Sequence, residues 1–147
     1  MGLNRFVSCQ DEYNILNRNI EAELIPAMQK YGCGLLPYFP LASGLLTGKY
    51  KRTEMPEGAR LTDMPTFANR IYLTDENFDI VDNLNKFAHK TGHSILELAF
   101  GWMASRPTTA SIIAGATKPE QIDANVAAVN WVLSQSEIDE VNKISAR

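Results

Sequence analysis

Three short apolar runs, separated by segments of helical character, constrain the fold of this chain most strongly. They occupy residues 6–10, 33–38 and 110–114, and each has the length and composition of a β-strand. Strands that alternate with helices form a parallel sheet covered by helices, and the close spacing of the first two implies a right-handed crossover. The pattern therefore predicts an α/β fold with three parallel strands.

Helical spacing and capping residues predict the covering helices. Residues 19–31 form the first, because acidic side chains come early, Lys30 comes late and Gly32 ends it. Pro26 is expected either to open the regular helix or to kink it. One more helix is expected over about residues 75–89, where apolar residues repeat at helical spacing. Three later helices begin at capping-box pairs, which are Ser94 with Glu97, Thr117 with Glu120 and Ser134 with Glu137.

A long connection, residues 41–74, separates the second strand from the helices that follow. A stretch of this length without clear periodicity is unusual in a compact domain and is usually functional or mobile. Three strands are also too few to close a barrel, which needs about eight, and a three-stranded sheet leaves two bare edges. The chain, taken as one domain over residues 1–147, is therefore expected to be incomplete or to assemble with copies of itself.

Composition excludes several classes of partner. The net charge of −3 and the pI near 5.4 argue against a nucleic-acid or anionic-membrane surface. There is no run of 18 apolar residues that would span a membrane, and no secretory leader is recognised at the start. Cys9 and Cys33 are expected to be reduced, buried thiols of a cytoplasmic protein.

The first candidate site is the loop that follows the second strand. Two glycines, Gly44 and Gly48, let the backbone approach a ligand closely. Ser43, Gly44 and the amides through Leu46 would then face a pyrophosphate, and Lys49 would add a positive charge. The alternative is a structural turn that leads into the long connection.

The second candidate site covers residues 115–125, at the start of a predicted helix. Thr117 can cap this helix and still present its hydroxyl, at a helix end that favours anions. Lys118 is placed for a phosphate monoester. Gln121 and Asn125 share one helix face, where their amides can hydrogen-bond a purine edge. The alternative is a well-capped surface helix with Lys118 in solvent.

Two further polar or aromatic residues stand at predicted strand ends. Gln10 ends the first strand, where its amide can pair with a carboxamide ligand; Tyr38, expected at the same level of the second strand, can stack on a planar ligand. The alternatives are an ordinary strand-end polar residue and a core tyrosine. Ligands of parallel α/β folds bind at the carboxyl ends of strands, so all these positions together favour one elongated ligand.

Other chemistries fit the sequence poorly. His89 and His93 are four residues apart, but Gly92 breaks the helix between them and no Glu or Cys ligand is expected nearby, so no metal site is predicted. A convincing Ser-His-Asp order, a G-x-S-x-G motif and a G-x-G-x-x-G motif after a strand are all missing from the sequence. No catalytic residue is therefore assigned.

The chain resembles the C-terminal part of an aldo-keto reductase, a (β/α)8 TIM barrel that uses NADPH. The motifs that carry the resemblance are Gln10 to Asn14 with Arg18 and Glu21, residues 38–50, 96–102 and 133–144, and Ile113 to Lys118 through Asn125. The resemblance covers nearly the whole chain and implies that the three strands are barrel strands six to eight.

The resemblance also implies residue roles. Gln10 would hold the nicotinamide carboxamide and Tyr38 would stack on the nicotinamide ring. The loop around the pyrophosphate would contain Leu41, Ser43, Gly44 and Lys49, with Arg60 as a basic residue that folds over the cofactor. The adenosine 2′-phosphate and adenine would bind Gly115, Thr117, Lys118, Gln121 and Asn125. Ala124 departs from the pattern, since many members carry an acidic residue there.

The catalytic Asp, Tyr, Lys and His of the family lie on the first half of the barrel and match no residue here. The expected function is thus the cofactor-binding portion of an NADPH-dependent oxidoreductase that reduces aldehydes or ketones, with the isolated chain inactive. The small carbonyl substrate would be selected in part by residues 41–74. A second hypothesis is a non-catalytic protein that associates with itself through its sheet edges or regulates a partner, as the potassium-channel β subunits of the family do. A third is a purely structural fragment.

Overall fold

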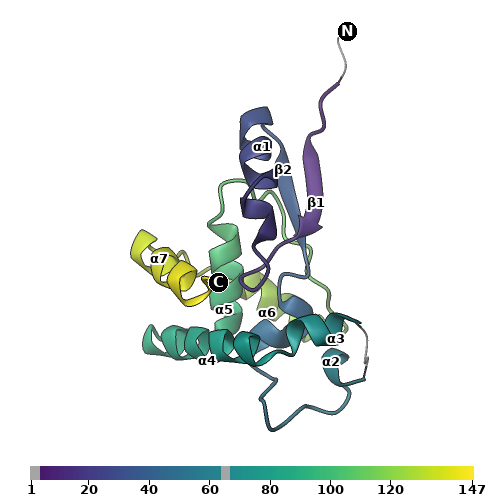
Figure 1. The fold of residues 1–147 in the computed structure, drawn as a ribbon, viewed down its shortest axis with the longest axis vertical. Coiled ribbons are helices and arrows are strands. Elements are labelled where there is room, and N and C mark those ends of the chain that lie inside the picture. Colours follow the sequence, from purple (N-terminus) through teal and green to yellow (C-terminus); the bar gives the residue numbers. More distant parts are fainter. Residues whose placement is uncertain (1–3, 64–66) are drawn as a thin grey trace.

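A two-stranded parallel sheet stands beside a group of helices in the computed structural model, which describes residues 4–63 and 67–147 (Figure 1). The strands are β1 (Ser8–Glu12) and β2 (Gly34–Tyr38). The helices, with η marking 3₁₀ helices, are in chain order η1 (Asn19–Glu21), α1 (Leu24–Tyr31), η2 (Ala42–Thr47), α2 (Arg60–Asp63), α3 (Phe67–Tyr72), α4 (Asp75–Lys90), α5 (Ile95–Ala104), α6 (Pro119–Ala128) and α7 (Gln135–Ile144).

The predicted parallel arrangement of the first two strands is confirmed. β1 and β2 are parallel, with Ser8 opposite Gly34 and Glu12 opposite Tyr38, and α1 connects them. The predicted helix over residues 19–31 consists of two pieces, η1 and α1. Pro26 lies in the first turn of α1, where its missing N–H leaves no intrahelical bond unmade, so it opens the regular helix.

The predicted third strand is wrong as a continuous strand. Residues 108–113 run along β2 but join it only through the bridges Leu35–Thr109 and Tyr38–Ile113. The amide of Leu35 donates to the Thr108 carbonyl over 2.6 Å, and the carbonyl of Leu35 accepts from Ala110 over 2.8 Å. A regular ladder would next need an N–H from Pro37, which has none. The Pro37 carbonyl instead accepts from Ile113 over 2.9 Å, so the pairing slips.

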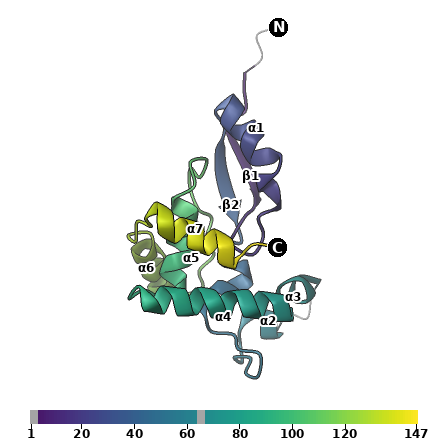
Figure 2. The same ribbon diagram turned by 60° about the vertical axis from the view of Figure 1, so that its left-hand side comes forward.

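The core lies around α5, which passes between the sheet side of the molecule and α4 (Figures 1 and 2). Trp102 and Met103 of α5, Leu84 of α4 and Leu45 of η2 are all 0% exposed. Full burial of such a side chain stabilises the fold by roughly 1.5–3 kcal/mol. The helical spacing predicted for α4 is confirmed, because Phe78, Val81, Leu84 and Ala88 share its buried face.

Two of the three predicted capping boxes are confirmed and the third is displaced. In each confirmed box a serine side chain accepts from the amide of a glutamate, whose carboxylate accepts from the amide of that serine. The pairs are Ser94 with Glu97 and Ser134 with Glu137. At α6 the helix begins after Lys118, not Thr117. The side-chain oxygen of Gln121 accepts from the amides of Thr117 and Lys118 over 2.7 and 3.3 Å. A carboxamide in the third helical position reaches the backbone ahead of the helix, so Glu120 is not the capping partner.

The long connection is folded against the rest of the protein. The amide of Leu61 donates to the Tyr50 hydroxyl over 3.0 Å. Arg52 contacts Asp75 at 2.7 Å and also pairs with Asp79, so one guanidinium ties the connection to the first turns of α4. Residues 41–74 therefore hold short helices in the described part of the segment, which excludes residues 64–66.

Both cysteines are free thiols, but each is half-buried and not buried as expected. Within residues 4–63 and 67–147, no helix combines the length and apolar character needed to cross a membrane.

Gly101 of α5 is required by close packing. A β-carbon at this position would stand 2.6 Å from the Trp131 carbonyl oxygen and 2.5 Å from a Leu133 methyl. We predict that Gly101→Ala lowers the free energy of unfolding by at least about 1 kcal/mol, because overpacking outweighs the better helix propensity of alanine. Urea unfolding checks this.

Gly115→Ala is the matched control, since nothing lies within 4 Å of a β-carbon there. Equal stability of the two variants would contradict the packing argument.

Candidate functional site

The carboxyl ends of the strands form the candidate site. Tyr38 ends β2 directly opposite Glu12, which ends β1. Ile113 bridges to Tyr38 from the other side, so the segment that begins at Gly115 leaves this same edge. Three chain segments therefore emerge together, as a ligand site in a parallel α/β fold requires.

The sequence suggested that Gln10 ends its strand, and this prediction is wrong. Gln10 is exposed in the middle of β1, opposite Leu36. The expectation placed Gln10 level with Tyr38, but β1 extends two residues further because Asp11 and Glu12 keep the parallel pairing. Gln10 thus lies two residues before the carboxyl end of β1, on the exposed side of the strand. The carboxyl ends of β1 and β2 are called the strand mouths below.

The end of β1 carries a pair that the sequence did not reveal. The Tyr72 hydroxyl donates a hydrogen bond to a Glu12 carboxylate oxygen. Burial, and then this hydrogen bond, raises the pKa of Tyr72, whose side chain is only 4% exposed. Sixty residues separate the partners, so no local spacing could have predicted their contact.

The loop after β2 has an uncommon backbone. Phe39, Ala42 and Ser43 have φ values of 51°, 47° and 57°, and Gly44 has 96°. Each non-glycine residue in this region costs on the order of 1–2 kcal/mol, and such strain gathers at functional sites. Buried neighbours hold the loop in place, because Ala42 and Leu45 are 0% exposed.

The amides of this loop serve mainly the loop itself. Gly44 and Leu46 donate to the Leu41 carbonyl over 2.8 and 3.2 Å, and Ala42 donates to the Phe39 carbonyl over 3.0 Å. The expectation that the amides through Leu46 face a pyrophosphate is therefore wrong for Gly44 and Leu46. A six-residue segment that folds into a 3₁₀ helix turns those donors back on itself.

Two cations lie against the same loop. A β-carbon at Gly44 would be 3.1 Å from Cε and 3.3 Å from Nζ of Lys49, so the lysine stem lies along the glycine backbone. The guanidinium of Arg60 stands 5.3 Å from the centre of the Phe39 ring, a cation–π distance. The structure thus places Lys49 along Gly44 and Arg60 over Phe39, at two points of the same loop.

The second predicted segment is exposed at the start of α6. The Thr117 hydroxyl is 3.2 Å from the side-chain oxygen of Gln121, so this carboxamide is directed toward the helix start. Asn125 lies one turn further along α6, half-buried. Gln121 and Asn125 therefore do not present two equivalent free amides.

Polar or half-buried residues line cavities at two places in the described part of the chain. One of about 450 Å³ lies between α5, α6 and residues 109–114, and Asn125 lines it. The other, of about 410 Å³, lies beside η1, α4 and α7. Gln10, Ser43 and Thr117 line neither of these cavities.

His93 does have an acidic neighbour, contrary to expectation. Its Nδ1 is 3.2 Å from a carboxylate oxygen of Glu97, and its ring stacks on Trp131 at 3.9 Å. The described part of the chain contains no group of three or more possible metal ligands around this pair or elsewhere.

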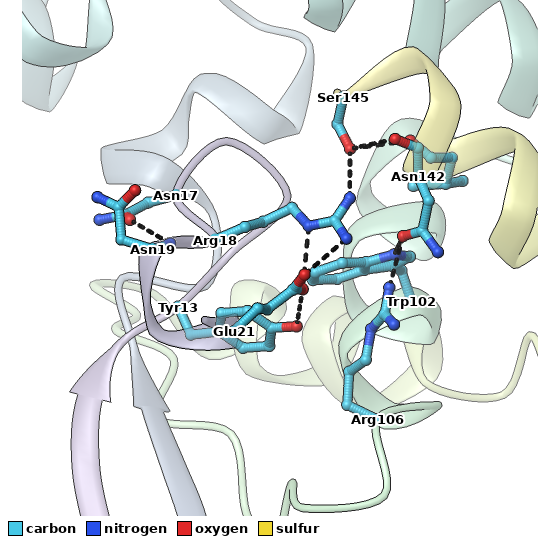
Figure 3. Close-up of polar contacts among 10 residues, drawn as sticks. Tyr13, Asn17, Arg18, Asn19, Glu21, Trp102, Arg106, Asn142 and Ser145 are labelled. Carbon is cyan, nitrogen blue, oxygen red and sulfur yellow. Dashed lines mark hydrogen bonds and ion pairs between the residues drawn. The ribbon is translucent and has the colours of Figure 1, made fainter. Parts of the chain in front are cut away.

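A polar network lies next to the carboxyl ends of the strands (Figure 3). Glu21 accepts from Arg18 at 2.7 and 3.0 Å and from the Tyr13 hydroxyl at 2.6 Å. Arg106 stacks on Trp102 at 4.0 Å and donates to Asn142 over 2.7 Å. The network joins the segment after β1 to α5 and α7.

Charge and burial act against each other in this network. Burial alone would raise the pKa of Glu21, but the hydrogen bonds from Arg18 and Tyr13 outweigh it and hold that pKa below 4.5. Burial lowers the pKa of Arg106, while the nearby Glu21 carboxylate counters this. Glu21 therefore stays ionised between Arg18 and the Tyr13 hydroxyl, with the Arg106 charge nearby.

The comparison with known proteins identifies the family. The aldo/keto reductase family model matches residues 2–146. The chain belongs to the aldo/keto reductase family. The predicted membership of this family is thereby confirmed.

Individual relatives within the aldo/keto reductases differ in their described roles. A probable voltage-gated potassium channel subunit beta from Oryza sativa is 38% identical over 140 residues, which cover 92% of this chain and 42% of that protein. An NADH-specific methylglyoxal reductase from Escherichia coli is 36% identical over 132 residues, covering 87% and 38%. The chain thus spans about two fifths of the length of these relatives.

A solved structure shows the same fold. Glycerol dehydrogenase from Gluconobacter oxydans matches with a TM-score of 0.76 and 30% identity, over 95% of this chain and 42% of that one. The α/β fold is therefore that of an aldo/keto reductase over the matched region, with two paired parallel strands in the described residues.

The position of Glu21 in the network predicts an acid-sensitive fold. Its folded pKa is below the usual 4.5, so its contribution is complete above that pH and is lost as pH falls through the folded value. We predict that Glu21→Gln lowers the stability by about 1 kcal/mol at pH 7, a figure reduced for its partial exposure. The variant should then lose less stability than the parent on acidification to about pH 3.

Denaturant unfolding at several pH values measures this, with Glu57→Gln as a control because Glu57 is exposed. Parallel pH profiles for the parent and Glu21→Gln would refute the assigned role of Glu21.

Proposed function

We propose that this chain is the cofactor-binding portion of an NADPH-dependent oxidoreductase that reduces aldehydes or ketones. The observation that carries the proposal is the strained loop at residues 39–44, with Lys49 along Gly44 and Arg60 over Phe39. Strain held by buried neighbours at the mouth of a parallel sheet is typical of a ligand site, and two cations suit a pyrophosphate.

The nicotinamide end would lie at the strand mouths. Tyr38 would stack on the nicotinamide ring, and Gln10 would bind its carboxamide from two residues below the end of β1. Leu41 and Ser43 would line the pyrophosphate beside Lys49. Bound nicotinamide supplies the hydride, and the residues of this chain orient it and neutralise the phosphate charge.

The adenosine end would lie at the start of α6. Gly115, Thr117 and Lys118 are exposed there, and the Lys118 ammonium and the positive dipole of the helix start would favour a 2′-phosphate. The adenine would lie along Gln121 and Asn125, next to Ala124. Because Gln121 already accepts from Thr117, its amide nitrogen is the group left for the ligand.

The described residues would form one wall of the cradle within a partial (β/α)8 barrel over residues 1–147. Residues 41–74 would act as the cofactor and substrate loop of this barrel. The chain spans only 42% of the glycerol dehydrogenase structure, and the family's proton donor matches no residue here. We propose that the isolated chain, a cytoplasmic protein, binds NADPH without reducing a small carbonyl substrate.

A second candidate function is a non-catalytic protein that associates with itself or regulates a partner. Phe6 and Val7 are 90% and 81% exposed beside the open edge of β1, and unpaired edges favour association. A relative is named as a potassium channel β subunit. A dimer that persists without cofactor in size-exclusion chromatography would favour this candidate.

Lys118 tests the proposed cofactor preference. We predict that Lys118→Ala weakens NADPH binding about tenfold, which corresponds to the loss of one charge-assisted hydrogen bond. NADH binding should be unchanged, because NADH lacks the 2′-phosphate. Titration calorimetry with both cofactors measures the dissociation constants.

Lys30→Ala is the control, since Lys30 is an exposed cation at the far end of α1. Equal weakening of NADPH and NADH, or no weakening of either, would reject the placement of the 2′-phosphate at Lys118.

A further inference from the structure

A cavity of about 410 Å³ with a mainly polar set of side chains lies beside η1. It lies between the turn after β1, the start of α4 and the end of α7. Its polar lining residues are Asn17, Arg18, Asn19, Tyr72, Asn77, Asn142, Ser145 and Arg147. Among the described residues that line it, two carry a guanidinium and none has an acidic side chain. None is a proposed cofactor residue.

The walls of this cavity are held rigidly. Arg18 is fixed by Glu21, which stands behind the lining, and it donates to the Ser145 hydroxyl over 3.1 Å (Figure 3). Asn77 is 2% exposed, and its amide nitrogen donates to the carbonyls of Ile71 and Tyr72 over 3.0 and 2.9 Å. The oxygen of Asn77 is thereby aimed at Arg147, from which it accepts.

The lining of the cavity offers hydrogen-bond donors that no described residue uses. The guanidinium of Arg18 has five N–H groups. Three of its hydrogen bonds go to Glu21 and Ser145. The oxygen of Asn142 accepts from Trp102 and Arg106 over 3.1 and 2.7 Å, which fixes the orientation of its amide. The amide nitrogens of Asn142 and Asn17 then make no hydrogen bond with any described residue.

The charges favour an anion. Glu21 pairs with Arg18 but does not line the cavity. Arg106, which is also outside the lining, adds a further half-buried cation to the same network. Arg147 Nε is 4.0 Å from a carboxylate oxygen of Glu76, and the Arg147 side chain remains 45% exposed. Preorganised guanidinium and amide donors with no acidic side chain in the lining suit an oxyanion.

We propose that this cavity binds a small oxyanion of the phosphate class, at a site separate from the cofactor cradle. Arg147, Arg18, Asn17 and Asn142 supply the donors. Tyr72 lines the cavity and donates to Glu12 at the end of β1. One hydrogen-bonded pair therefore connects this oxyanion site to the strand mouths.

Nuclear magnetic resonance titration with inorganic phosphate, at constant ionic strength, tests the proposal on the full chain. Saturable shifts are expected for the amides of Asn17, Asn142 and Arg147. Arg147→Gln should weaken binding about tenfold, as expected for one charge-assisted bond. Arg18→Gln is avoided, because it breaks the network that holds the fold.

Two variants keep the test specific. Lys143→Gln removes the same charge from α7, where its side chain is 80% exposed, and should leave binding unchanged. Lys118→Ala should also leave it unchanged, which separates this site from the proposed cofactor site. Non-saturating shifts, equal weakening by Arg147→Gln and Lys143→Gln, or loss of binding in Lys118→Ala would each overturn the proposal.

Discussion

One buried carboxamide, that of Asn14, holds the mouths of both strands together. Asn14 is 0% exposed. Its oxygen accepts from the amides of Leu16 and Asn17, each over 2.9 Å, which shapes the turn after β1. Its nitrogen donates to the Phe39 carbonyl over 2.9 Å, where the strained loop after β2 begins. Loss of a buried partner of this kind leaves polar groups unsatisfied at about 1–3 kcal/mol each.

The proposed functions follow from that connection. The loop at residues 39–44 keeps its left-handed backbone because Asn14 fixes one end and buried leucines fix the other. The turn after β1 leads directly into Arg18 and Glu21, which join the strand mouths to α5 and α7 (Figure 3). The proposed cofactor cradle and the proposed oxyanion cavity therefore share one support.

Local signals in the sequence predicted the parts that depend on local chemistry. The α1–β2 unit, the end of α1 at Gly32 and the caps at Ser94 and Ser134 follow from spacing and residue type alone. The break in the third strand could not be predicted in this way. Pro37 lacks an N–H donor, and this matters only once the partner segment of β2 is known. The contact of Glu12 with Tyr72 depends on tertiary packing across the long connection. The family came from several spaced motifs in order, confirmed by the match over residues 2–146.

The central claim is that the segments that follow the carboxyl ends of β1, β2 and residues 108–113 bind one extended dinucleotide. Isotope-labelled chain titrated with NADP⁺ and followed by backbone amide resonances tests it most directly. The account predicts saturable shifts that gather at Tyr38, in the loop through Lys49 and at the start of α6. Shifts confined to other surfaces, or shifts that never saturate, would contradict it.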